Sequence, residues 1–86
     1  MRPSPNDYRI VGQWLVSRCT FLIVMGVDAQ QCKELLPLAL DGYTHGDLCG
    51  VESIWYEYWN DVLREWVPLA EIPMRVVKRM VSKTAA

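Results

Sequence analysis

The sequence predicts an all-α domain of about four helices, some of them short. Three observations favour this fold class. Apolar residues recur at helical spacing from Ser4 to Gly26 and again from Ser53 to Trp66, and helix-start signals stand at Asp28 and Pro73. At 86 residues the chain is expected to be a single helical domain, 1–86, with a disordered C-terminal few residues.

The first predicted helix begins at "SPND". Ser4 can cap it, Pro5 suits the first helical position, and Gly26 is a typical stop. The β-branched run "FLIVM" could instead form a buried strand, so the second half of this segment has two interpretations. On a helix, one face would carry Ile10, Val11, Trp14, Leu15, Phe21, Leu22 and Met25.

Asp28 reads as the N-cap of a second helix, with Gln31 completing a capping-box-like pair. This helix, "AQQCKELLPLAL", should stop at Gly42 and be kinked by Pro37, which lacks an N–H donor. The following "DGYTHGDLCG" contains three glycines and is predicted to be a loop.

The segment "SIWYEYWNDVLREW" is predicted to be the third helix. On a strand, Glu57 would share a face with Trp55 and Trp59, which a half-buried sheet disfavours. A hairpin that turns at Asn60-Asp61 is the alternative, since aromatic residues favour strands. The apolar side of the predicted helix holds Ile54, Trp55, Tyr58, Trp59, Val62, Leu63 and Trp66.

"PLAEIP" is predicted to be a connector, because prolines stand at both its ends. Pro73 can then start a short last helix. That helix would bury Val76, Val77, Met80 and Val81 and expose Arg75, Lys78, Arg79 and Lys83.

Charge and composition argue against nucleic-acid binding, a membrane span and a signal peptide. The net charge of -1 disfavours a nucleic-acid binder, although the bases after Ile72 keep that class as an alternative. The uncharged run Cys19–Val27 is too short to span a membrane, and Asp7 and Asp28 argue against a signal peptide. Three widely spaced cysteines fit reduced thiols, so we expect a cytoplasmic protein with no membrane contact.

One loop could carry chemistry. His45, Asp47 and Cys49 could form a nucleophile with its base, and Cys19 and Cys32 could add metal ligands. Adjacent residues in one loop seldom have catalytic geometry, and these spacings match no zinc motif. We therefore expect no enzyme activity, no cofactor and no metal, and a small enzyme or metal-binding protein remains an alternative.

The aromatic segment favours protein binding. Glu57, Asp61 and Glu65 would repel a nucleic-acid backbone, whereas tryptophan and tyrosine dominate protein–protein contacts. Arg18 falls on the apolar face of the first predicted helix, so we expect it either to extend its charge to solvent or to pair with a carboxylate, one option being across an interface. The alternative is that the helix ends earlier or bends, and Arg18 reaches water. The predicted partner-binding residues are Arg18, Trp55, Tyr58, Trp59, Val62, Leu63 and Trp66.

Together these features predict a small interaction protein, a homodimer that binds another protein and regulates it. We expect it to act as an inhibitor or antiactivator that occludes the partner's assembly surface, with the aromatic helix lying in a groove. A secretion-type chaperone or adaptor is the alternative within the same class.

Overall fold

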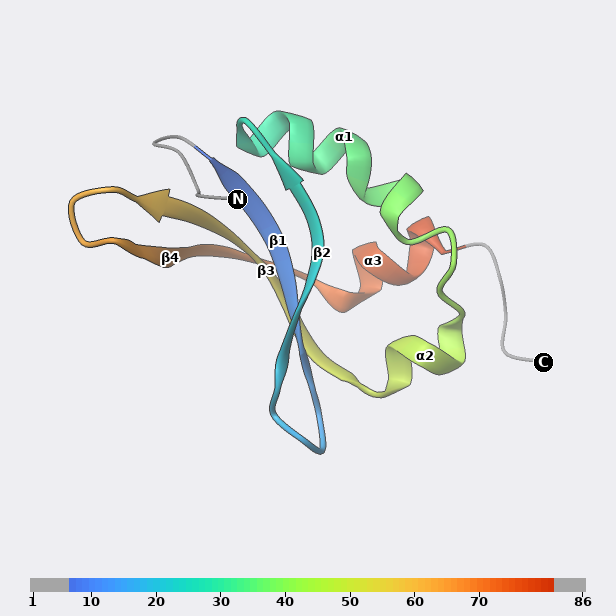
Figure 1. Ribbon diagram of the computed structural model, residues 1–86. Coiled ribbons are helices and arrows are strands. Elements are labelled where there is room, and N and C mark those ends of the chain that lie inside the picture. Colours follow the sequence, from blue (N-terminus) through green and yellow to red (C-terminus); the bar gives the residue numbers. More distant parts are fainter. Residues whose placement is uncertain (1–6, 82–86) are drawn as a thin grey trace.

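A four-stranded antiparallel sheet forms the centre of the molecule (Figure 1). The computed structural model describes residues 7–81, so the predicted cap at Ser4 and the predicted C-terminal disorder lie outside the described residues. The strand order is β2-β1-β3-β4. The elements are β1 (Tyr8–Trp14), β2 (Thr20–Gly26), α1 (Ala29–Ala39), α2 (His45–Cys49), β3 (Val51–Asn60), β4 (Glu65–Ile72) and α3 (Met74–Met80).

The predicted all-α fold is therefore wrong, and its first helix is the β1–β2 hairpin. The strand interpretation of "FLIVM" is correct, but the strand is at the edge of the sheet and none of its residues is fully buried. A turn at residues 15–19 and an extra residue in β2, Ile23, interrupt the alternation of apolar and polar residues. These two breaks let the apolar residues fall at helical spacing, although their β-branched side chains pack well on a sheet.

The predicted third helix is also wrong, because Val51–Asn60 is a strand and Trp66 lies on the next one. The chain turns after Asn60, as in the hairpin alternative. The Asn60 side-chain oxygen accepts hydrogen bonds from the Val62 and Leu63 amides, both at 3.0 Å, which closes the turn. Glu57 does share a face with Trp55 and Trp59, and its charge is satisfied by a partner from a distant part of the chain.

The connector "PLAEIP" is a third error, since Pro68 lies inside the edge strand β4. An edge strand tolerates proline because one side of it lacks a pairing neighbour. The helices after Asp28 and Pro73 are confirmed as α1 and α3. The glycine-rich loop contains the five-residue α2, whose first turn is closed by a capping box between Thr44 and Asp47.

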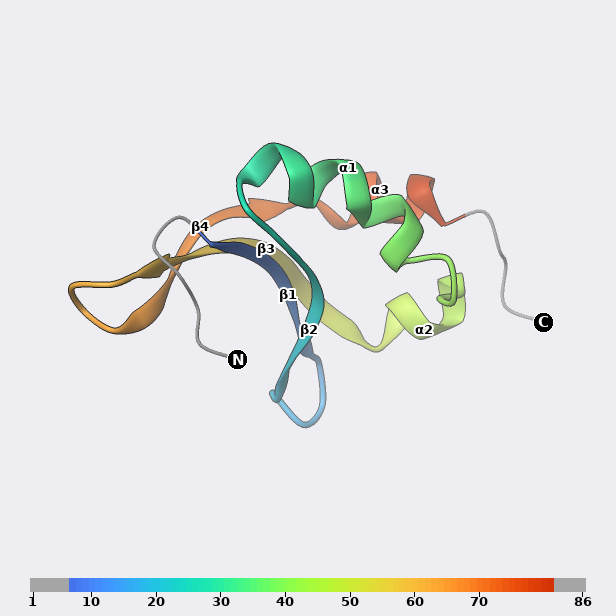
Figure 2. The ribbon, with the colours of Figure 1, turned by 45° about the horizontal axis from the view of Figure 1, so that its top comes forward.

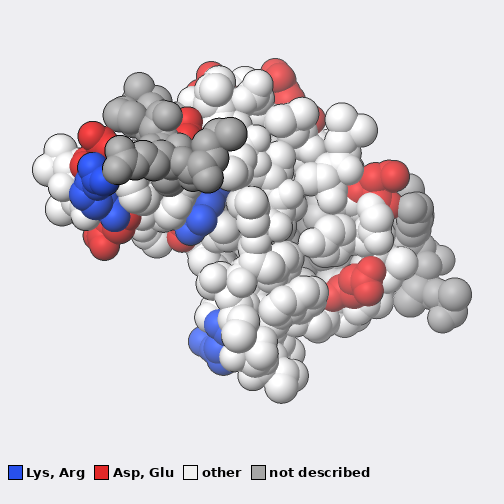
Figure 3. Space-filling view, in the orientation of Figure 1, with Lys and Arg blue, Asp and Glu red and all other residues white. Residues whose placement is uncertain are grey.

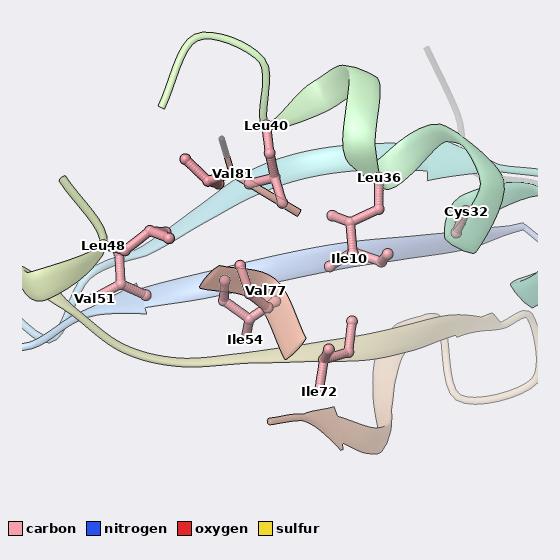
Figure 4. Close-up of a cluster of buried hydrophobic side chains, with 10 residues drawn as sticks. All are labelled: Ile10, Cys32, Leu36, Leu40, Leu48, Val51, Ile54, Ile72, Val77 and Val81. Atoms are coloured by element: carbon pink, nitrogen blue, oxygen red, sulfur yellow. The ribbon is translucent and has the colours of Figure 1, made fainter. Parts of the chain in front are cut away.

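All three helices pack on the same face of the sheet, where they share one core (Figures 2 and 4). Leu36 of α1, Leu48 of α2 and Val77 of α3 contribute buried side chains to it. They meet Ile10 of β1 and Ile54 of β3, both fully buried. This packing leaves the other face of the sheet without a helix among residues 7–81.

Candidate protein-interaction surface

The helix-free face of the sheet carries three of the four tryptophans. Val11 pairs with Trp55, and Arg9 with Glu57, so alternation sends these side chains to the face opposite Ile10 and Ile54. We call this surface the open face. It comprises Arg9, Val11 and Gln13 of β1, Thr20, Leu22 and Met25 of β2, Ser53, Trp55, Glu57 and Trp59 of β3, and Trp66, Pro68 and Glu71 of β4.

Glu57 is the centre of the polar contacts on the open face. Glu57 is only 7% exposed. One carboxylate oxygen, Oε1, accepts a hydrogen bond from Arg9 Nε at 2.7 Å and lies 2.7 Å from Arg9 Nη2. The other oxygen, Oε2, accepts from the indole Nε1–H of Trp55 at 2.9 Å. These three donor contacts satisfy the buried carboxyl group, which explains how Glu57 can lie among tryptophans.

Aromatic contacts extend this arrangement across β4. The Arg9 guanidinium lies 4.2 Å from the centre of a Trp66 ring, in a cation–π contact. Trp66 in turn meets Trp59 edge to face, with ring centres 5.5 Å apart. Trp55, Glu57, Arg9, Trp66 and Trp59 therefore form one continuous chain of contacts, called here the tryptophan chain. Each ring is partly buried and held in place by its neighbours.

No family model, curated protein or solved structure matches this chain.

Arg18 lies away from the open face, in the β1–β2 turn, in the left-handed conformation with φ 64°. The expected carboxylate partner is present within the same chain, because Arg18 Nη1 donates to Glu52 Oε1 at 2.5 Å. The apolar helix face on which Arg18 was placed does not exist. The Arg18 side chain is 60% exposed, so this ion pair is a surface contact.

The other predicted partner-binding residues divide between three places. Trp55, Trp59 and Trp66 lie together on the open face. Tyr58 lies on the opposite face, with its ring centre 6.3 Å from that of Tyr8. Val62 and Leu63 lie in the β3–β4 turn and are 91% and 59% exposed, next to the end of the tryptophan chain.

Arg9 and the pairing role of Glu57 were missed by sequence reasoning. The two residues are 48 positions apart, and nothing local marks them as partners. The alternation of Trp55, Glu57 and Trp59 was the available signal. It indicates a strand whose central acid needs a cation, and β1 supplies that cation at Arg9.

The His45 loop has a structural role in the fold. His45 Nε2 lies 3.1 Å from the Lys78 carbonyl oxygen and 2.7 Å from that of Val81, so the ring holds the end of α3. Both neighbours are acceptors, so Nε2 carries the proton. Asp47 Oδ2 accepts from the Thr44 amide within the capping box.

Within residues 7–81, no three histidine, cysteine or acidic residues are grouped to hold a metal ion. Cys19 and Cys49 are exposed and Cys32 is buried, all three as free thiols. None of the helices described is long and apolar enough to cross a membrane.

Proposed function

We propose that this protein binds another protein through the open face of its sheet. The observation that carries the proposal is the tryptophan chain, which places three indole rings on the one face that no described helix covers. Tryptophan and arginine dominate the energetics of protein–protein contacts. Because these tryptophans and Arg9 lie on a sheet face that no described helix covers, they are better suited to contact a partner than to form a second core of the domain.

The rigidity of the tryptophan chain supports the same proposal. Arg9 is held by Glu57 and Trp66, and Trp55 by Glu57, before any partner arrives. Side chains that are ordered in the free protein lose little conformational entropy on binding. Leu22 and Met25, 52% and 45% exposed, extend the face with apolar area that a partner could bury.

The charges on the open face favour a protein over a nucleic acid. A sheet face with aromatic side chains can stack bases, but it then needs free cations for the phosphates. Arg9 is the only base on the open face and already neutralises Glu57, while Glu71 adds a negative charge. A phosphate backbone would therefore meet a neutral to acidic surface.

The test compares proteins captured from the native organism by the wild type and by a Trp55→Ala/Trp59→Ala variant. The matched control is Leu38→Ala, which removes a 75% exposed side chain on α1, on the other side of the molecule. We expect the double variant to lose the partner and the control to keep it. Circular dichroism must show that both variants fold. Capture of the same proteins by the folded double variant and the wild type would overturn the proposal.

Regulation of the partner stays a prediction. An aromatic helix lying in a groove cannot be its mechanism, since the aromatic residues lie on strands. A partner that covers the open face could still be prevented from assembling with other molecules. Adding this chain to the purified partner should then lower the partner's oligomeric mass in light scattering, and the Trp55→Ala/Trp59→Ala variant should not.

A further inference from the structure

The two edges of the sheet differ in how they are protected. β4 carries two devices that discourage pairing with another strand: Pro68, which lacks a donor, and the charges of Glu65 and Glu71. β2, with the sequence "TFLIVMG", contains neither a proline nor a charge over its seven residues. Within the described chain β1 is the only strand that pairs with β2. β2 has a bulge at Ile23, but its outer edge lacks the proline and the charges that protect β4.

The side chains along this edge are self-complementary in one antiparallel register. Leu22 lies opposite Val11 and Met25 opposite Arg9, so both point to the open face. Two residues, Ile23 and Val24, separate them at the bulge. If two copies of β2 pair about a two-fold axis between positions 23 and 24, Leu22 of each copy lies opposite Met25 of the other. In this register the dimer has two Leu22–Met25 contacts, so the exposed Leu22 and Met25 side chains of both copies are buried.

The charges at the two ends of β2 fit the same antiparallel arrangement. Arg18 lies before the strand, with its side chain 60% exposed, and Asp28 follows it. Antiparallel pairing brings Arg18 of each copy beside Asp28 of the other, whereas parallel pairing would bring like charges together. A guanidinium has five N–H donors, so Arg18 can keep Glu52 and meet a second carboxylate. Between these ends, uncharged side chains cover the middle of the molecule (Figure 3).

We propose that two copies of this chain pair antiparallel through β2, with Leu22 opposite Met25, to form one eight-stranded sheet. The interface is isologous: each copy contributes the same edge of β2, so no β2 edge is left for a third copy and the assembly closes as a dimer. The proposal does not rest on the proposed function. Edge pairing leaves the tryptophan chain of each copy accessible and extends the open face across the two-fold axis.

The test measures mass in solution by sedimentation equilibrium over a wide range of protein concentrations. The wild type should reach twice the 9.9 kDa of the single chain. Leu22→Lys should raise the dimer dissociation constant by about a hundredfold, because each dimer would hold two unpaired ammonium groups against Met25. The matched control is Leu69→Lys on β4, since Leu69 and Leu22 are both 52% exposed. The control should leave the dissociation constant unchanged.

A complementation experiment fixes the register. Met25→Glu alone should also weaken the dimer, while mixing it with the Leu22→Lys chain should restore association, because lysine at 22 then faces glutamate at 25. A monomeric wild type, a dimer that Leu22→Lys leaves intact, or a mixture that stays monomeric would each overturn the proposal. A strand donated by a different protein would give the first of these results. The Trp55→Ala/Trp59→Ala variant, which leaves β2 unchanged, should still dimerise while it loses the partner, so the two proposals are tested separately.

Discussion

The Arg9 guanidinium and the Glu57 carboxylate, 48 positions apart, form an ion pair with Nε and Nη2 both 2.7 Å from Oε1. The pair joins β1 to β3 on the open face and orients two of its tryptophans. Arg9 covers Trp66, and Glu57 accepts from Trp55. Stability and the proposed contact surface therefore depend on the same two side chains.

Removing both members of this pair should cost less than the sum of the costs of removing each one. Arg9→Met or Glu57→Leu alone should lower the free energy of unfolding by about 2 kcal/mol, because each leaves a partly buried charge without its partner. The double variant should lose less than the sum of the two losses. Urea denaturation of all four proteins measures the coupling, and additive losses would contradict the role of the pair.

Gly12→Ala should destabilise the protein through one close contact. A Cβ at position 12 would lie 2.5 Å from Phe21 Cζ, and the Phe21 ring is stacked on Trp14 with centres 4.4 Å apart. The ring must therefore move and disturb the stack, at a cost of about 1–3 kcal/mol. Denaturant unfolding measures this cost. Phe21→Leu should recover part of it in the Gly12→Ala background and should be destabilising alone.

Arg64→Gly should stabilise the protein. Arg64 has φ 58° in the β3–β4 turn, a left-handed conformation that glycine adopts without steric cost. The relief of strain exceeds the extra chain entropy of glycine, so we expect a gain of about 0.5 kcal/mol. Arg18→Gly at φ 64° is the matched variant and should gain less, because it also removes the Glu52 pair. Thermal unfolding of the two variants gives the comparison.

His45→Ala should loosen α3 before the rest of the fold. The ring donates to the carbonyls of Lys78 and Val81, so its loss leaves the end of α3 without that donor at a cost of about 1–2 kcal/mol. Hydrogen exchange should accelerate at the α3 amides and change little in β1. Equal acceleration in both elements would indicate that His45 supports the whole domain.

The protein should lose stability at alkaline pH through Cys32. Burial, with a smaller effect of Asp28, raises the pKa of the Cys32 thiol above 9.0 in the folded state. The contribution of this thiol to the free energy of unfolding is complete below pH 9.0. It is lost as the pH rises toward the folded pKa, because the thiol of the unfolded chain ionises first. Cys32→Ala should flatten the dependence of unfolding free energy on pH in that range.

A thiol reagent gives an independent measurement of Cys32. In the native protein at neutral pH, Cys19 and Cys49 are exposed and should react rapidly. Cys32 should react only as the protein unfolds. If all three thiols reacted with the reagent at the same rate, the burial of Cys32 would be contradicted.

Local signals in the sequence determined α1 and α3. The Asp28 side chain accepts from the Gln31 amide at 2.7 Å, and Pro73 stands directly before α3, as expected. Capping depends on residues three or four positions apart, so it can be read from the chain alone. The aromatic cluster was also visible there, and its three tryptophans do share one surface.

The sheet was decided by tertiary structure. Helical spacing in residues 4–26 and 53–66 was compatible with strands once turns and bulges interrupted the alternation. The decisive contact is Arg9 with Glu57, because it makes an acid between two tryptophans acceptable on a sheet face. Pairing across 48 residues depends on strand register, which local propensity does not specify.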